Sequence, residues 1–161
     1  MKTRILRALA LALTVAIALP AITSAAWPVT SHSSYVSQKF HDGHRGLDIA
    51  ATKWTGVVPI GNGKVVFAGW KNNCGGYQVW VRHRDGVTHS AYYHLAQETT
   101  YSGHYVTGEK TRIGYVGTTG CVTGAHVHVE VWKGTPWRSG SYRVNPWNYV
   151  KKGYWLPYQY R

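Results

Sequence analysis

Short stretches rich in Val, Tyr, Trp and Thr, either alternating with polar residues or running apolar, recur along the chain after residue 50. Gly, Asn or Asp bounds each stretch, which is typical of β-strands. The expected strands are 55–60, 64–69, 77–83, 87–94, 111–116 and 126–132. No amphipathic helix of three turns follows residue 26. The pattern therefore predicts a mostly β fold, in which an antiparallel sheet forms a groove walled by loops.

Two junctions between these strands have the composition of hairpin turns. Residues 61–63, Gly-Asn-Gly, separate the first two stretches, and residues 84–86, Arg-Asp-Gly, separate the third and fourth. Gly and Asn accept the positive φ that tight hairpin turns require. We therefore expect a hairpin at each junction.

The first 26 residues have the order of a secretory signal peptide. Lys2, Arg4 and Arg7 precede an apolar run, 8–19, and small residues follow at 23–26. The run is too short to span a bilayer, so no stable membrane anchor is expected. Export with removal of this peptide predicts a protein that is secreted, periplasmic or associated with the cell wall.

The remainder, residues 27–161, has the size of one domain, and no linker or internal repeat divides it. The formal net charge of the full chain is +12; three cations lie in the first 26 residues and all six acids follow, so residues 27–161 carry +9. Such an excess favours an anionic partner, although it could serve solubility alone. For an exported protein, anionic wall polymers are the first candidates, and no nucleic-acid-binding motif is present.

Residues 126–131, His-Val-His-Val-Glu-Val, alternate polar and apolar without a break. Side chains of a strand repeat every second residue, so His126, His128 and Glu130 should share one face while the valines enter the core. Two imidazoles would then project side by side. Taken alone, they could equally be exposed polar residues.

Upstream, His44 and Asp48 are four residues apart. Zinc binds imidazole nitrogen and carboxylate oxygen, and a catalytic zinc keeps three protein ligands and one position for water. His44, Asp48 and a later histidine would make that set. The neighbouring His41 and Asp42 cannot be excluded by spacing.

In order and spacing, three blocks of the chain resemble the signatures of the LytM (lysostaphin-like, M23) family of zinc metallopeptidases. The first ends in His44-Arg45-Gly46-Leu47-Asp48, the second is Tyr92-Tyr93-His94-Leu95, and the third is a Gly-Thr loop, 117–125, leading into 126–130. Trp27-Pro28-Val29 and Val144-Asn145-Pro146 also resemble the family's domain edges, so the likeness covers nearly all of 27–161.

The resemblance implies a fold of the duplicated-hybrid-motif type and assigns His44, Asp48 and His128 as ligands of one zinc ion. It assigns His94 and His126 as the catalytic histidines beside the metal. Ala125, Val127 and Val129 depart from the family's usual Pro, Leu and Phe, which puts substrate preference in doubt rather than metal binding.

Other candidates have weaker patterns. Glu130 could orient an imidazole, or it could be a structural acid. The remaining histidines, at positions 32, 41, 83, 89 and 104, have no matching partners and are expected to be structural or solvent-facing. The two cysteines, Cys74 and Cys121, lie in loops expected to flank the groove, and export favours one disulfide between them over two thiols.

The sequence thus predicts a secreted, monomeric zinc endopeptidase that cleaves peptide bonds in the stem or cross-bridges of peptidoglycan. Three alternatives stay open: a non-catalytic LytM-like regulator of wall hydrolases, a general secreted metalloprotease, and a basic nucleic-acid binder. The last leaves the five-residue constellation unexplained.

Overall fold

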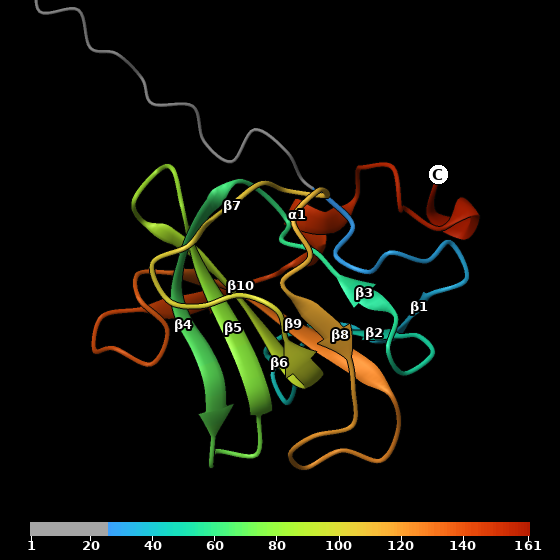
Figure 1. Cartoon of the computed structure of the whole chain (residues 1–161), viewed down its shortest axis with the longest axis horizontal. Helices are drawn as coiled ribbons and strands as arrows, with labels where there is room; N and C mark the ends of the chain where they lie inside the picture. Colours follow the sequence, from blue (N-terminus) through green and yellow to red (C-terminus); the bar gives the residue numbers. More distant parts are fainter. Residues whose placement is uncertain (1–25) are drawn as a thin grey trace, which may run out of the picture.

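The computed structural model describes residues 26–161 (Figure 1), so the expected signal peptide lies, except for Ala26, outside the described residues. The mostly β, antiparallel fold is confirmed: ten strands form one sheet. The strands are β1 (Tyr35–Gln38), β2 (Leu47–Ala50), β3 (Gly56–Val57), β4 (Gly63–Lys71), β5 (Gly76–His83), β6 (Thr88–Glu98), β7 (Tyr105–Val106), β8 (Gly114–Val116), β9 (His126–Lys133) and β10 (Tyr142–Val144). One helical turn, α1 (Trp147–Val150), and a 3-10 turn, Tyr158–Tyr160, follow.

The strand order is β1-β2-β9-β6-β5-β4-β7, with β10 added to β9 and a β3–β8 pair attached through β6. Strand β6 lies at the centre and changes partner along its length. Its first part, from Thr88 to Tyr93, pairs with β9, and its last part, from Leu95 to Glu98, pairs with β8. His94 lies between the two parts, which places it where the sheet divides.

One predicted hairpin is confirmed and the other is wrong. β5 and β6 pair antiparallel, and Gly86 closes their turn with φ 70° and an N–H donated to the carbonyl of His83 at 3.0 Å. Residues 61–63 do not join a hairpin, because β3 pairs with β8 whereas β4 pairs with β5 and β7. Pro59 lacks an N–H, and the carbonyl of Ile60 accepts the N–H of Ala26, so this segment bonds to the N-terminal segment.

The larger of the two core clusters lies on the face of the sheet opposite the paired histidines. Val127, Val129 and Val131 of β9 are fully buried, as the alternation predicts. They join Leu47 and Ile49 of β2 in one cluster. Each fully buried aliphatic side chain contributes about 1.5–3 kcal/mol relative to exposure, so the apolar face fixes the register that aligns the polar faces of β2 and β9.

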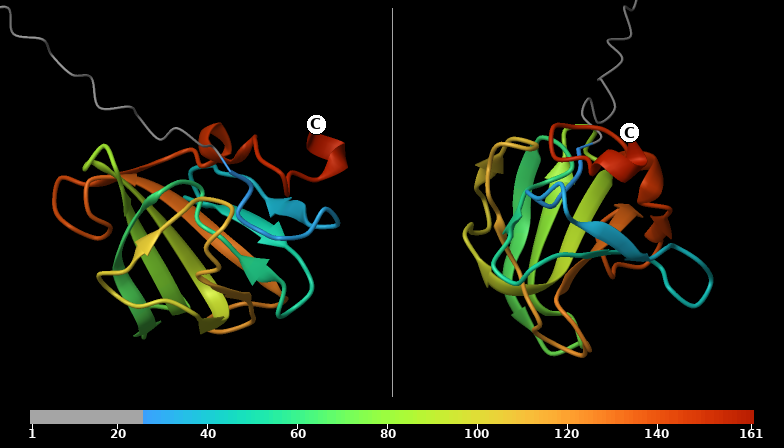
Figure 2. Two further views of the ribbon diagram at one scale, coloured as in Figure 1. Left: turned by 45° about the horizontal axis from the view of Figure 1, so that its top comes forward. Right: turned by 90° about the vertical axis from the view of Figure 1, so that its right-hand side faces the viewer.

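The two ends of the described chain meet at one end of the sheet (Figure 2). The buried ring of Trp27 contacts Trp147 of α1 and Tyr160, with ring centroids 6.4 and 5.5 Å apart. Its Nε1–H donates to Ser34 at 2.9 Å, so the indole is satisfied although it is buried. Within residues 26–161, no helix has the length and hydropathy needed to cross a membrane.

Acid should destabilise the protein through His83, a buried histidine at the end of β5. One ring nitrogen lies 3.1 Å from the carbonyl of Asn62 and the other 2.9 Å from Ser90 Oγ. Burial lowers the pKa of His83 to about 4, against a weaker opposing effect of the Asn62 bond. The unfolded chain binds this proton below about pH 6.5, so stability is complete above pH 6.5 and falls as the pH drops toward 4. His83→Gln should reduce the loss of unfolding free energy between pH 7 and 4.5 by about 2–3 kcal/mol, measured by urea unfolding.

Candidate active site

Three side chains, two from residues 44–48 and one from β9, bring one atom each to a common point. His44 Nε2 lies 3.1 Å from Asp48 Oδ1 and 3.1 Å from His128 Nδ1, and His128 Nδ1 lies 2.7 Å from Asp48 Oδ1. These atoms have the mutual spacing needed to ligate one metal ion. The structure therefore brings together the three residues that the resemblance assigns as ligands.

The sheet positions two of these side chains directly. Asp48 of β2 and His128 of β9 are register partners, so their side chains stand on the same face. His44 precedes β2 in a tight loop closed by two backbone hydrogen bonds between His41 and His44, of 2.9 and 3.0 Å. Gly46 leaves the space for His128, because a Cβ at position 46 would overlap the imidazole ring.

The chemistry of this set fits a metal cation. His44 Nδ1 lies 3.0 Å from the carbonyl of Lys39, an acceptor, so it carries the hydrogen and leaves the lone pair of Nε2 facing Asp48 and His128. His44 Nε2, Asp48 Oδ1 and His128 Nδ1 therefore face one another as electron-pair donors, with only the hydrogen on His128 available to lie between them. Burial alone would lower the pKa of His128, but the hydrogen bonds to Asp48 and Glu130 outweigh it and raise the pKa to about 9. A metal cation would take the place of that proton.

Asp48 is the anionic member of the set. Burial alone would raise the pKa of its carboxyl, but the hydrogen bond with His128 and the charges of His128, His126 and His44 hold it below its ordinary value. The group is therefore a carboxylate at neutral pH, the form that binds a metal.

Glu130 supports His128 from behind, with Oε1 3.5 Å from His128 Nε2. It is 5% exposed, and its other oxygen accepts hydrogen bonds from Tyr93 Oη at 2.6 Å and Trp132 Nε1 at 2.8 Å. Arg143 Nε lies 2.8 Å from Oε1 as an ion pair. Of the two interpretations of Glu130, the structure favours the one in which it orients an imidazole.

His94 occupies the bend at which β6 leaves β9. Its φ is 63°, in the left-handed region that non-glycine residues rarely adopt, and such strain is common at functional sites. Its N–H donates to Gly75 at 2.8 Å, and its Nδ1 lies 2.9 Å from the carbonyl of Thr119. Burial lowers the pKa of His94 to about 4, against the Thr119 bond, so the ring is neutral at pH 7 with a lone pair on Nε2.

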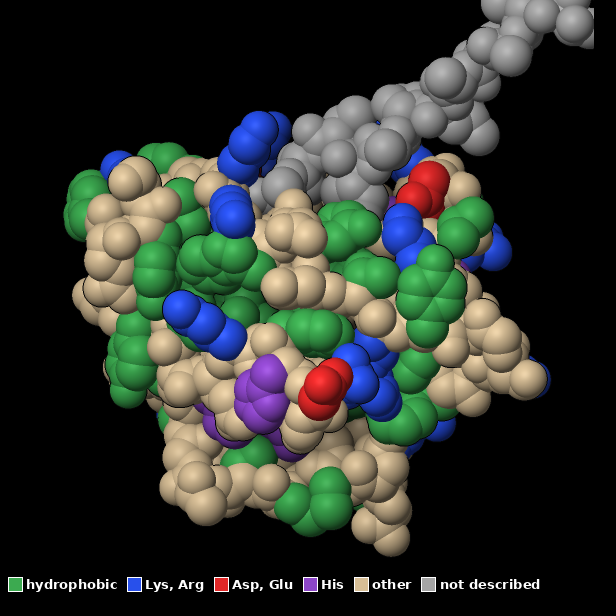
Figure 3. Space-filling model, turned by 180° about the vertical axis from the view of Figure 1, so that it is seen from behind, with side chains coloured by type: hydrophobic (Ala, Val, Ile, Leu, Met, Phe, Trp, Pro, Cys, Tyr) green, Lys and Arg blue, Asp and Glu red, His purple; other side chains and the backbone are tan. Residues whose placement is uncertain are grey.

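His126 lies beside His94, with ring centroids 5.0 Å apart. Its Nδ1 lies 3.0 Å from the carbonyl of Gly124, which leaves Nε2 facing the site, 3.9 Å from Asp48 Oδ2. The five predicted residues thus line one cavity of about 670 Å³, together with Gln38, Asn73, Gly75, Tyr93, Glu130, Trp137 and the loop 121–123. Figure 3 shows histidine side chains gathered on one face of the molecule, with acidic and basic side chains beside them.

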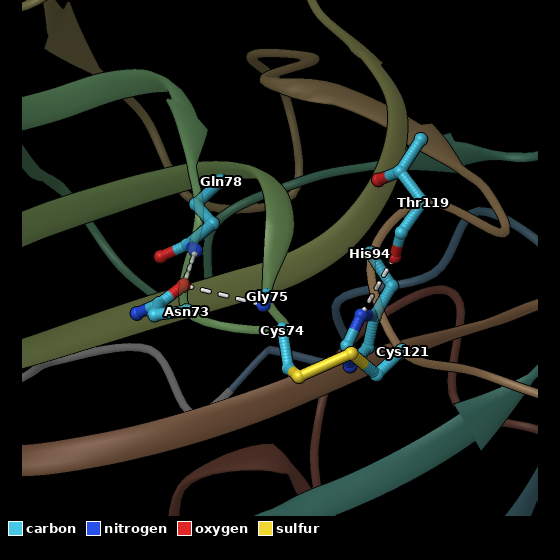
Figure 4. The surroundings of a disulfide bond; sticks show 7 residues. All are labelled: Asn73, Cys74, Gly75, Gln78, His94, Thr119 and Cys121. Atoms are coloured by element: carbon cyan, nitrogen blue, oxygen red, sulfur yellow. Dashed lines mark hydrogen bonds between the residues drawn. A yellow bond between two sulfur atoms is a disulfide. The ribbon is translucent and has the colours of Figure 1, made fainter.

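The disulfide between Cys74 and Cys121 is present (Figure 4), and both cysteines line this cavity. It joins the loop before β5 to the loop before β9. Cys121 N–H also donates to the carbonyl of Cys74 at 2.9 Å, and Gly120, at φ 81°, lets the two backbones approach closely. His94 is held by both loops, through Gly75 and Thr119.

Removing this bridge should lower catalysis more than metal binding. Cys74→Ser with Cys121→Ser frees both loops that hold His94, and a displacement of about 1 Å can cost roughly 100-fold in rate, so we expect a 10- to 100-fold loss of turnover with metal retained. The bridge joins residues 47 positions apart, and its loss should lower the free energy of unfolding by about 4 kcal/mol if it acts by restricting the unfolded chain. Rates are therefore compared at a temperature well below the melting point of the variant. Turnover equal to wild type would show that His94 needs no bridge. Two reactive thiols in the unreduced, denatured wild type would refute the bridge itself.

The alternative ligands lie outside the convergent set. Asp42 is almost fully exposed and pairs with Arg45 at 3.0 Å. His41 is exposed, and its ring nitrogens contact Gly43 N and Gln38. His32, His83, His89 and His104 have other contacts, with Leu156, Ser90, Val87 and Thr100 respectively.

Two residues in or beside the cavity, both beyond β9, were not predicted from the sequence. Trp137 lines it from the irregular loop after β9, and Arg143 comes from the three-residue strand β10. No periodicity marks either residue. The one sequence feature that points to them is the composition of residues 132–143, which contain two Trp and two Arg but no acidic residue.

Comparison with protein-family models gives a match over residues 42–146 to peptidase family M23. Lysostaphin from Staphylococcus simulans is 38% identical over 87 residues, which are 54% of this chain and 17% of lysostaphin. The DD-carboxypeptidase/endopeptidase Mpg from Neisseria meningitidis is 39% identical over 87 residues, 54% of this chain and 19% of Mpg. The aligned part thus spans about a fifth of these relatives' own length.

The fold is similar to solved structures over a larger share. The catalytic domain of lysostaphin from Staphylococcus simulans matches with a TM-score of 0.64 and 31% identity, over 73% of this chain and 90% of that domain. A zinc-containing peptidase from Vibrio cholerae matches with a TM-score of 0.60 and 26% identity, over 69% of this chain and 36% of that one.

Proposed function

The chain belongs to peptidase family M23, and from that premise we propose that it is an exported, monomeric zinc endopeptidase that hydrolyses peptide bonds of peptidoglycan. One observation carries the proposal: three atoms of the kinds that ligate metals converge within 3.1 Å of one another, and two further histidines line the same cavity. Relatives described as a zinc-containing peptidase, a DD-carboxypeptidase/endopeptidase and a peptidoglycan DD-endopeptidase support it.

His44 Nε2, Asp48 Oδ1 and His128 Nδ1 would hold the zinc, because histidine nitrogen and carboxylate oxygen are zinc's usual ligands. When bound, zinc would supply Lewis-acid chemistry, polarising the scissile carbonyl and lowering the pKa of its water. Lys39 and Glu130 fix the two imidazoles from behind, at 3.0 and 3.5 Å, so that their lone pairs converge. Three protein ligands would leave a fourth position for water or substrate, which could enter from the cavity.

His94 and His126 carry the proton transfers. Each ring places Nδ1 at a backbone carbonyl, which leaves an Nε2 lone pair free to accept the proton of the attacking water. Once protonated, the same nitrogen donates to the oxygen on which negative charge develops or to the departing amine. The neutral state of His94 at pH 7 suits it to accept a proton.

Digestion of purified peptidoglycan tests the proposal. The protein, supplied with zinc, should release new amino termini, and mass spectrometry of the products should identify one class of cleaved bond. Stimulation of another hydrolase without release of amino termini would support the regulator. Equal cleavage of wall peptides and of an unrelated unfolded protein would support the general protease.

Binding to walls should weaken as salt rises. Residues 27–161 carry a net charge of +9. Within the described residues, Arg45 and Arg143 are the only Lys or Arg side chains paired with an acid. Most of the other Lys and Arg side chains are exposed to solvent. Exposed charges are screened over about 8 Å at 0.15 M salt, so retention on wall material should fall above roughly that concentration. Sedimentation with walls, before and after removal of their anionic polymers, measures this. Salt-independent retention would point instead to the exposed aromatic rings.

A further inference from the structure

A second cavity, of about 620 Å³, lies next to the catalytic one. Trp137 lines both, so the two cavities are neighbours on either side of this side chain. The walls of the second cavity include Arg45, Arg138 and Arg143 and no acidic residue. A substrate in the catalytic cavity that extends past Trp137 therefore meets three guanidinium groups.

Arg143 packs against two aromatic rings within this wall. Its guanidinium lies 4.4 Å from the ring centroid of Trp132 and 4.5 Å from that of Trp137. Its Nε lies 2.8 Å from Glu130 Oε1, yet within the described chain the guanidinium makes no aligned hydrogen bond. A planar guanidinium packed against two neighbouring rings suits recognition of a planar anion, because part of its side-chain freedom is already lost.

Arg138 and Arg45 are the exposed arginines of this cavity. Arg138 is exposed, and the carbonyl of the same residue accepts the N–H and hydroxyl of Ser141, which orders its loop. Arg45 pairs with Asp42, whose side chain is 99% exposed, and such exposed pairs contribute little and are readily exchanged. Counting Asp42 and Glu130 against the three arginines, the cluster keeps a charge of +1.

We propose that this second cavity binds a free carboxylate of the peptide substrate, so that the protein prefers wall peptides bearing a carboxylate near the scissile bond over uncharged glycine chains. The inference rests on the proposed function, since it places the substrate in the catalytic cavity. A carboxylate fits because two N–H groups of a guanidinium match its two oxygens. The face of Trp137 offers the adjoining peptide plane a surface to stack on.

Blocked glycine hexapeptides with one glutamate, placed at each position in turn, test this inference against the same peptides with glutamine. Binding is measured by calorimetry on the zinc-supplied protein, and cleavage is measured in parallel. At positions on one side of the scissile bond, Glu peptides should bind about tenfold more tightly than Gln peptides, the size of one charge-assisted hydrogen bond. Arg138→Gln should reduce that ratio to about twofold or less. Arg84→Gln, an exposed arginine in the β5–β6 turn, is the matched control and should keep it.

Equal binding of Glu and Gln peptides at every position would overturn the inference. So would a preference that survives both Arg138→Gln and Arg45→Gln. A preference that depends on Arg138, in a protein that cleaves no peptide and no wall, would support the carboxylate site while contradicting the peptidase.

Discussion

Asp48→Ala should lose its zinc and, with it, all measurable cleavage of peptidoglycan. Asp48 Oδ1 lies within 3.1 Å of both His44 Nε2 and His128 Nδ1. As a carboxylate, Asp48 is the one anionic donor among the three. Removing it leaves two imidazoles, too few for a tetrahedral catalytic site. His44→Ala and His128→Ala should fail in the same way. Elemental analysis after dialysis gives the zinc content, and appearance of new amino termini gives the activity.

Asp42→Ala and His41→Ala are the matched controls, because both residues are exposed and lie outside the convergent set. Each should keep about one zinc per chain. Asp48→Ala that retained stoichiometric zinc and wild-type turnover would exclude Asp48 as a ligand. Loss of zinc in His41→Ala would indicate that His41, rather than His44, is a zinc ligand.

His94→Ala and His126→Ala should keep their zinc yet lose peptide cleavage by about 100- to 10,000-fold, the range typical of acid–base and oxyanion groups. Both leave His44, Asp48 and His128 in place. The loss should appear in turnover rather than in metal content, and the double variant should lose less than the product of the two single effects, since the rings lie 5.0 Å apart and act on the same reaction.

The same two measurements can reverse this assignment. If His126→Ala lost its zinc while His128→Ala kept it, ligand and catalyst on β9 would be exchanged. If His94→Ala kept full turnover, the strained bend in β6 would have a structural purpose only.

The sequence predicted the centre of the site because β9 alternates with period two. That pattern fixes which face His126 and His128 share, and the buried valines confirm it. The pairing of β2 with β9 is long-range, and the four residues of β2 are too few to mark a strand. Only the resemblance to a known family connected Asp48 to His128.

The parts that escaped prediction depend on contacts between segments distant in sequence. The Gly-Asn-Gly segment suggested a hairpin, but the N-terminal segment competes for the hydrogen bonds of Ile60. Trp137 lines two cavities, and no local sequence pattern predicts that position. The disulfide was predictable because two cysteines allow one intramolecular pairing, whereas its contact with both loops that hold His94 was not.

Zinc-dependent cleavage of purified peptidoglycan tests the central claim most directly. Wild-type protein should contain about one zinc per chain and release new amino termini in proportion to enzyme and time. A chelator should stop the release, and added zinc should restore it. Stoichiometric zinc with no release of amino termini from any wall tested would contradict the account, and the non-catalytic regulator would replace the peptidase.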